Sequence, residues 1–150
     1  MKIGKYKDGG SKSKVWAYLF EVKKLFSVAL LKFEDGGREV LHSHAFDCVS
    51  VILGPGYLEE TFLDGTKRCH TPGRVLATRR EDLHQVSSVG VTYALTLRGP
   101  WSGQWFEARE DGVYAMTNGR REYRLLEART LREQSELVRA LGLVAGVEDL

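Results

Sequence analysis

The residues of this chain best suited to chemistry are His42 and His44, which stand two positions apart in a stretch of extended composition. Successive side chains of a β-strand point to opposite faces, so an extended segment over residues 40–44 would place both imidazoles on one side, close together. Neutral imidazole nitrogens are common ligands of divalent metal ions. The pair therefore predicts part of a metal site, which needs a further ligand from elsewhere in the chain.

The third ligand is expected to be His84. The chain has four histidines, so only His70 and His84 remain to join the pair. His84 begins a second strand-like run, whereas His70 precedes Thr71-Pro72-Gly73, a composition typical of a turn. We interpret His70 and its neighbour Cys69 as hairpin residues without function.

Two residues that follow the pair could complete the site. On a strand that runs straight from His42, Cys48 would face the same side and Asp47 the opposite side, unless a β-bulge re-aims it. Three histidines alone would leave an open coordination sphere. The Cys48 thiolate would favour a closed, structural zinc site, and the Asp47 carboxylate a harder site suited to iron or manganese. The sequence leaves these three hypotheses open.

The elements that must position these residues are short strands separated by glycine-bearing turns. Turns such as Asp35-Gly36-Gly37 and Asp64-Gly65 divide runs that are rich in β-branched and aromatic side chains. This spacing predicts an all-β sandwich or barrel. The predicted strands cover residues 15–22, 25–33, 42–53, 57–62, 74–78, 84–88, 91–98 and 104–108.

The two ends of the chain differ in composition from this middle part. Residues 1–14 are rich in Lys, Gly and Ser and are expected to form a flexible arm. Near the other end, Thr130 and Glu133 form a capping box ahead of an apolar stripe, which predicts a helix. We expect a single domain, with a barrel over residues 15–128 and a C-terminal helix and tail over residues 129–150 packed on it.

Composition and charge describe an ordinary globular chain. Of its 150 residues 43% are hydrophobic and 28% charged, with a formal net charge of +2, which excludes a disordered or collagen-like protein. Nucleic-acid binding would require a strongly basic face, and no apolar run has the length of a membrane span. The two cysteines make no disulfide framework. We expect a cytoplasmic protein whose partner is a small molecule, not nucleic acid or a membrane.

Several motifs occur in an order that resembles the cupin superfamily. Gly36 is followed after five residues by His42-Ser43-His44, then by Gly54-x-Gly56-Tyr57-x-Glu59, and later by the lone histidine of His84-Gln85-Val86. With Leu95-Thr96-Leu97-Arg98-Gly99-Pro100, this order is similar to that of small single-domain cupins of bacteria and phages. The resemblance spans about residues 15 to 108.

The resemblance implies a jelly-roll barrel, also called a double-stranded β-helix, with one divalent transition metal in its mouth. Fe(II) is favoured, with Zn, Mn or Ni as alternatives. Cupins usually carry a glutamate ligand four or five residues after the second histidine, where this chain has Cys48 and Val49. A bare three-histidine site would be similar to that of the thiol-dioxygenase cupins, which residues 56–62 also resemble.

The expected function is that of a metal-binding cupin, in the form of a non-haem Fe(II) dioxygenase-like enzyme acting on a small anionic substrate. Neutral imidazoles leave the centre cationic, which favours a carboxylate or a thiolate. Tyr57 and Tyr93 are candidate catalytic residues that would donate hydrogen bonds, and Arg79 and Arg98 are candidates to bind a substrate carboxylate. The alternatives are a non-catalytic small-molecule-binding or regulatory cupin and a cupin of the sugar isomerase or epimerase type.

A homodimer is the expected assembly. Open jelly rolls leave strand edges that must be covered. The aromatic strand over residues 15–22 is a candidate for exchange across a two-fold axis.

Overall fold

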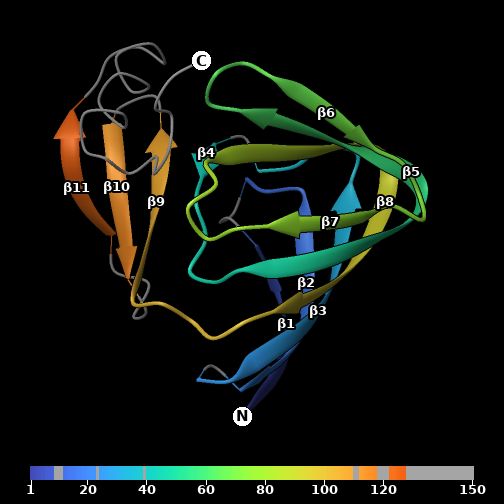
Figure 1. Ribbon diagram of the computed structural model, residues 1–150, viewed down its shortest axis with the longest axis horizontal. Helices are drawn as coiled ribbons and strands as arrows, with labels where there is room; N and C mark the ends of the chain where they lie inside the picture. The colour runs from blue at the N-terminus through green and yellow to red at the C-terminus, as the bar shows by residue number, and fades with distance from the viewer. Residues whose placement is uncertain (9–11, 23, 39, 110–111, 118–121, 128–150) are drawn as a thin grey trace.

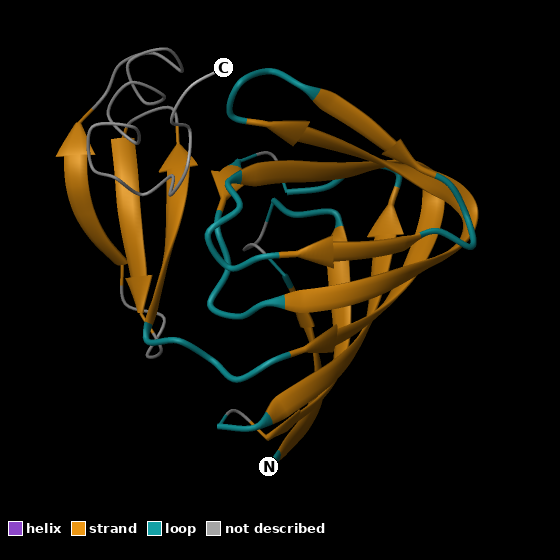
Figure 2. Cartoon of the chain, in the orientation of Figure 1, coloured by secondary structure: helices purple, strands orange, loops and turns teal. Residues whose placement is uncertain are grey.

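The fold is described from a computed structural model, which describes residues 1–8, 12–22, 24–38, 40–109, 112–117 and 122–127. Every regular element among these residues is a β-strand (Figure 2). No helix of this described part has the length and apolar composition needed to cross a membrane. The strands are β1 (Lys2–Lys7), β2 (Val15–Val22), β3 (Phe26–Glu34), β4 (Leu41–His42), β5 (Cys48–Phe62), β6 (Lys67–His70), β7 (Val75–Thr78), β8 (His84–Arg98), β9 (Gln104–Arg109), β10 (Gly112–Thr117) and β11 (Glu122–Glu127).

The strands form one antiparallel sheet that curls into a half-barrel (Figure 1). Its main path runs β1-β2-β3-β8-β4-β9-β10-β11, while β5 pairs with β8 and also with β6 and β7. The all-β class expected from the strand spacing is therefore confirmed, and the expected sandwich or barrel takes the form of a curled antiparallel half-barrel.

The half-barrel is built around two long strands, β5 and β8. They pair from Cys48–Arg98 at one end to Phe62–His84 at the other, with register shifts around Gly54 and Gly56. A side chain at Gly56 would place its Cβ 2.3 Å from the carbonyl oxygen of Val89, so the close approach requires glycine. Irregularities of this kind bend a strand without ending it. The glycines at residues 54–56 and 89–90, which were predicted to lie in turns between strands, therefore lie inside β5 and β8.

The core lies inside the curl. Along β2 alternate residues are buried, which is the pattern of a strand with one face toward the core. Two clusters of buried apolar side chains result, one made by Val15, Phe33, Ile52, Leu58 and Ala94 and the other by Leu41, Leu83, Ala108 and Val113.

The ends of the chain require one correction. Lys2–Lys7 forms strand β1 and pairs with β2 along its whole length, so this part of residues 1–14 is not a flexible arm. Lysine side chains of β1 lie over the rings of Trp16 and Tyr18, which adds contacts that composition does not reveal. The helix predicted within residues 129–150 lies outside the described residues.

The outer face of the sheet carries exposed apolar side chains on neighbouring strands. Leu97 of β8 is 55% exposed, and it pairs with Val28 of β3 on one side and with Val49 of β5 on the other. Both edges of β2 are already paired within the chain, by β1 and β3, so an exchange of this strand would have to displace one of them. The homodimer stays a prediction, for which this outer face offers a surface.

Candidate metal centre and ligand cavity

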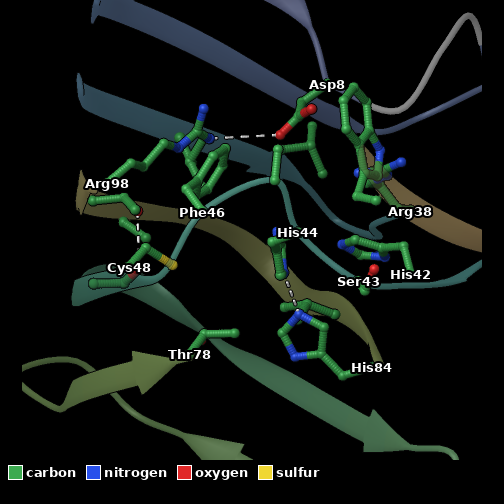
Figure 3. A pocket seen from close by; sticks show the side chains of 18 of the residues that line it. Asp8, Arg38, His42, Ser43, His44, Phe46, Cys48, Thr78, His84 and Arg98 are labelled. Atoms are coloured by element: carbon green, nitrogen blue, oxygen red, sulfur yellow. Dashed lines mark hydrogen bonds and ion pairs between the residues drawn. The ribbon is translucent and has the colours of Figure 1, made fainter. Parts of the chain in front are cut away.

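Three histidines meet at one point of the half-barrel. His42 ends β4, His44 follows in the next loop, and His84 begins β8, directly opposite His42 in the register. The ring centroids are 4.9 Å, 5.3 Å and 5.0 Å apart, and one nitrogen from each ring lies within 4.8 Å of the others. Figure 3 shows the three rings turned toward one another at the wall of a cavity. The structure thus brings together the three histidines that the spacing singled out, in a group that could hold a metal ion.

Hydrogen bonds decide which nitrogen of each ring is available. The Nδ1 atom of His42 lies 3.0 Å from the carbonyl oxygen of Val40, and Nδ1 of His84 is bonded to the carboxylate of Glu60. Carbonyl and carboxylate oxygens only accept hydrogen bonds, so both Nδ1 atoms carry the proton. The Nε2 atoms of His42 and His84 therefore keep their lone pairs, which is the state a metal ligand needs.

Burial favours the neutral form of two of the three histidines. It lowers the pKa of His42 and of His44 well below the usual value, and the nearby Arg38 guanidinium lowers both pKa values further. Neutral imidazole is the ligating form, so these rings need not lose a proton when a metal binds at neutral pH.

The donor set fits a divalent transition ion. Nitrogens held at about 2.0–2.1 Å from one ion are separated by roughly 3.0–3.4 Å. The Nε2 atoms of His44 and His84 lie 2.7 Å apart, and the whole group of ligand atoms lies within 4.8 Å, so the observed separations bracket that spacing. Imidazole donors suit iron, zinc, nickel and copper.

Cys48 and Asp47 are not part of this group. The chain leaves β4 at His42 and bends before β5 begins, so no straight strand connects the histidines to Cys48. Burial raises the pKa of the Cys48 thiol, which disfavours the thiolate that a zinc site would need. Asp47 is exposed, and its carboxylate accepts hydrogen bonds of 2.8 Å from the backbone and the guanidinium of Arg80. Of the three sequence hypotheses, the structure corresponds to the bare three-histidine site.

A carboxylate that sequence reasoning did not select stands behind His84. Glu60 is 2% exposed and accepts hydrogen bonds from Nδ1 of His84 and, at 2.8 Å, from Nε2 of His70. Burial alone would raise the pKa of Glu60, but the hydrogen bonds from the two histidines lower it. The available signal was the period of two along β5, since Glu60 falls on the same inward face as Leu58.

The three histidines open onto a cavity of about 350 Å³ that reaches across the half-barrel to Arg98. Although His84 and Arg98 begin and end the same strand, the bend of β8 brings both to this cavity. The charged lining residues are four cations and two carboxylates, so the lining carries a positive excess. They are Lys7, Arg38, Arg98, Arg109, Asp8 and Glu107.

Arg98 is held rigidly in the cavity wall, where it is 4% exposed. Its Nη1 donates to the hydroxyl of Tyr6 at 3.3 Å, its Nη2 lies 3.7 Å from Asp8, and its guanidinium stands over the ring of Phe46 (Figure 3). The buried Nε meets no hydrogen-bond partner among the described residues. The guanidinium as a whole lines the cavity and brings a positive charge to its wall.

A second guanidinium lies close to the histidines. Arg38 is paired with Glu107, which stands opposite His42 in the register and also accepts a 2.7 Å hydrogen bond from Arg109. The negative charge of Glu107 is therefore offset by two cations. The sequence contained no signal for this arrangement, because its members come from a loop and from β9.

The other predicted site residues lie elsewhere. Leu58 and Ala94 line the cavity, and since neighbouring side chains of a strand face opposite sides, Tyr57 and Tyr93 point to the outer face. Arg79 is exposed in the loop before β8 and is absent from the described lining of the cavity. Of the two arginines predicted to bind substrate, only Arg98 lines the cavity.

Comparison with solved structures gives the same architecture in bacterial proteins of low sequence identity. A protein of Silicibacter pomeroyi, described as a sugar phosphate isomerase from a cupin superfamily, matches with a TM-score of 0.60 at 13% identity, over 86% of this chain and 95% of its own. An RmlC-like cupin of Shewanella frigidimarina matches with a TM-score of 0.52 at 16% identity, over 66% of this chain and 85% of its own. The EutQ protein of Clostridium difficile matches with a TM-score of 0.52 at 12% identity, over 67% and 81%.

The comparisons by sequence add no further relative. No protein-family model matches the chain, and no curated protein sequence matches it. The evidence for the family is thus the half-barrel, the position of its three histidines and the solved structures that share this architecture. On that evidence the chain has the fold of the cupin superfamily.

Proposed function

We propose that this chain is a metal-dependent cupin enzyme, in which an ion held by His42, His44 and His84 works with Arg98 on a small anionic substrate. The observation that carries the proposal is that the three imidazoles and a buried arginine line one cavity. We favour Fe(II) and a dioxygenase-like reaction.

The choice of metal follows from the donor set. Three neutral nitrogens bind a transition ion but leave part of its coordination sphere open, whereas a structural zinc site is closed by four protein ligands. The bound ion would bring dioxygen and a donor atom of the substrate together. Among the described residues no carboxylate belongs to the three-histidine group, so the charge of the ion is left to be balanced by an anionic substrate.

Arg98 would bind the anionic group of that substrate. Tyr6 and Asp8 contact the guanidinium of Arg98, and the ring of Phe46 lies against it. The guanidinium is therefore positioned before the substrate arrives. The guanidinium can donate a charge-assisted hydrogen bond to the anion, and such a bond contributes about 1.5–3 kcal/mol.

The remaining lining favours a substrate with an apolar body. Most of the cavity wall between the histidines and Arg98 consists of aliphatic and aromatic side chains. The hydroxyls of Ser50 and Thr96 are 2.9 Å apart and form a hydrogen bond with each other, which leaves them fewer hydrogen bonds to offer a polyol. Small carboxylates or thiol acids therefore suit the cavity better than sugars do.

A sugar-phosphate isomerase is the second hypothesis. Its support is the similarity to the Silicibacter pomeroyi protein of that description, together with the positive excess of the cavity lining, which also suits a phosphate. A non-catalytic binding cupin is the third hypothesis, in which the same cavity would hold a ligand without turnover.

Metal content and turnover test these hypotheses in order. The parent chain, His42→Ala and His84→Ala are purified from iron- or zinc-supplemented cells and analysed by plasma emission. We expect about one metal ion per parent chain and a loss of most of it in both variants. Equal metal in all three proteins would contradict the metal site and with it the enzyme.

Turnover separates the catalytic alternatives. The Fe(II)-loaded parent is incubated with propionate or thioglycolate in an oxygen electrode, and the Zn(II)- or Mn(II)-loaded parent with ribose 5-phosphate under NMR. Oxygen uptake that requires a carboxylate or thiol supports the dioxygenase. Isomerisation without oxygen uptake supports the second hypothesis, and ligand binding without either reaction supports the third.

A further inference from the structure

Glu60 joins His84 to His70 in a continuous chain of hydrogen bonds. Its Oε1 accepts from Nδ1 of His84, and its Oε2 accepts from Nε2 of His70 at 2.8 Å. The side chains of His84 and Glu60 are each 3% exposed, while that of His70 is 12% exposed. All four histidines of the chain therefore belong to one connected site, including the one whose composition indicated a turn.

The register of three strands produces this contact. In β5, Leu58 pairs with His70 of β6, while Phe62 pairs with His84 of β8. Glu60 lies midway between these two pairs on the inward face, so its carboxylate can reach a histidine on either neighbouring strand. Glu59, on the opposite face, is exposed and forms a natural control.

We propose that Glu60, anchored by His70, is a positioning residue that holds His84 in the tautomer and orientation required of a metal ligand. The proposal deepens the proposed metal function and rests on it. Its second component is electrostatic, because the carboxylate that cupins usually place on the metal is missing here and Glu60 supplies a negative charge one imidazole away.

The arrangement of oxygens supports positioning over direct ligation. Each oxygen of Glu60 already accepts a hydrogen bond from a different histidine. Glu60 does not belong to the described group of side chains whose ligand atoms converge. A carboxylate behind a ligating imidazole fixes the ring and increases the basicity of its other nitrogen, and removal of such a partner lowers metal affinity about 10- to 100-fold.

His70 has the supporting role of fixing the carboxylate. A buried carboxylate needs its oxygens hydrogen-bonded, and His70 satisfies the one that His84 does not. Without His70, Glu60 would keep its bond to His84 but could rotate toward other donors. A His70 variant should therefore weaken the site less than a Glu60 variant does.

The test compares Glu60→Gln and His70→Ala with the parent and with Glu59→Gln, the same substitution on the opposite face of the strand. Cobalt(II) affinity is measured by calorimetry, and the visible absorption of the cobalt protein reports the ligand geometry. We expect Glu60→Gln to bind cobalt(II) about 10- to 100-fold more weakly with a changed spectrum, and His70→Ala to lose several-fold. Glu59→Gln should match the parent.

A second measurement needs no metal. Nitrogen-15 NMR of the histidine rings in the metal-free parent should show His84 protonated at Nδ1, and Glu60→Gln should give a mixture of tautomers. Folding of every variant is checked by circular dichroism, and the parent spectrum keeps the test decisive if Glu60→Gln does not fold.

The two proposals fail in different ways. Failure of the parent to bind cobalt(II) would contradict the metal function, whatever the NMR result. A parent that binds cobalt(II) normally, but whose His84 carries its proton on Nε2, would overturn the role of Glu60 alone. Cobalt(II) binding by Glu60→Gln within twofold of the parent, with the same spectrum, would do the same.

Discussion

The Nε2 atoms of His44 and His84 lie 2.7 Å apart, although 40 positions separate the two residues in the chain. The contact exists because β4 pairs with the start of β8, which places the loop after His42 against the first residue of that strand. Two neighbouring lone pairs at this distance repel unless a proton or a cation lies between them. Because the proton of His84 is on Nδ1, Nε2 of His44 donates to Nε2 of His84 in the metal-free chain, and a metal ion would take the place of that proton.

Substitution of Arg98 should remove the anion site. We expect Arg98→Met to bind propionate about 10- to 150-fold more weakly than the parent, since charge-assisted hydrogen bonds contribute about 1.5–3 kcal/mol. Calorimetric titration of the metal-loaded proteins measures the change. Arg79→Met is the matched control, because Arg79 is exposed outside the cavity, and it should bind propionate as the parent does. Equal affinities for the parent and Arg98→Met would argue that the anion binds elsewhere.

Cys48 should behave as a buried thiol and not as a ligand. Burial raises its pKa, so a smaller fraction is thiolate at pH 8 than in a free cysteine, and alkylation should accelerate only as the pH rises above the ordinary thiol range. Iodoacetamide labelling of a Cys69→Ser variant, followed by mass spectrometry, should proceed at least about tenfold more slowly in the folded than in the urea-unfolded chain.

The same residue gives a metal test. Cys48→Ser should keep the metal content of the parent, because Cys48 is not in the three-histidine group. A sulfur-to-cobalt charge-transfer band in the parent that disappears in Cys48→Ser would refute this and restore the thiolate hypothesis.

Gly37 should tolerate no side chain. A Cβ at this position would lie 1.9 Å from the carbonyl oxygen of Val86, in the backbone of β8. Gly37→Ala should therefore destabilise the chain by about 1–3 kcal/mol, as overpacking does, and weaken metal binding by displacing the segment that leads to His42. Urea denaturation measures the first effect. In Gly4→Ala, where nothing lies within 4 Å of the added Cβ, stability should change by less than about 0.5 kcal/mol.

The homodimer expected from the sequence should depend on the outer face of the sheet. Leu97 lies on this outer face, between Val28 of β3 and Val49 of β5 on the neighbouring strands. Leu97→Glu should convert a dimer into a monomer, because an unpaired charge would be buried at the interface. Light scattering would report a halved mass. Leu25→Glu, in the turn between β2 and β3, should leave the dimer intact, and a monomeric parent would contradict the assembly.

The sequence indicated which segments form strands, because strand formation depends in part on neighbouring residues. The alternation of buried and exposed side chains in Val15–Val22 and the turn residues after Glu34 are local signals. The ends of the strands were harder to predict, since residue type alone does not distinguish a glycine that ends a strand from a glycine inside a β-bulge. Gly54 and Gly90 both have positive φ angles within continuous strands.

The strand at Lys2–Lys7 shows another limit of local reasoning. Its lysines and glycine indicate a solvated arm, yet the segment is paired with β2. It also places the hydroxyl of Tyr6 where it accepts a hydrogen bond from Arg98. Pairing with the next strand and the contact of Tyr6 with Arg98 thus decided its structure. The composition of the segment alone does not reveal these contacts.

The sequence by itself determined the three candidate histidines, because the chain offers few histidines and the period of two in His42-Ser43-His44 points two of them the same way, but it left open whether Asp47 or Cys48 joins them. Only the tertiary structure decided that Glu60 and His70 stand behind His84, that Arg98 faces the histidines across a cavity, and that Asp47 turns outward to Arg80. The physical reason is strand register. Local composition fixes which residues share a face, whereas the packing of the whole sheet fixes which faces meet.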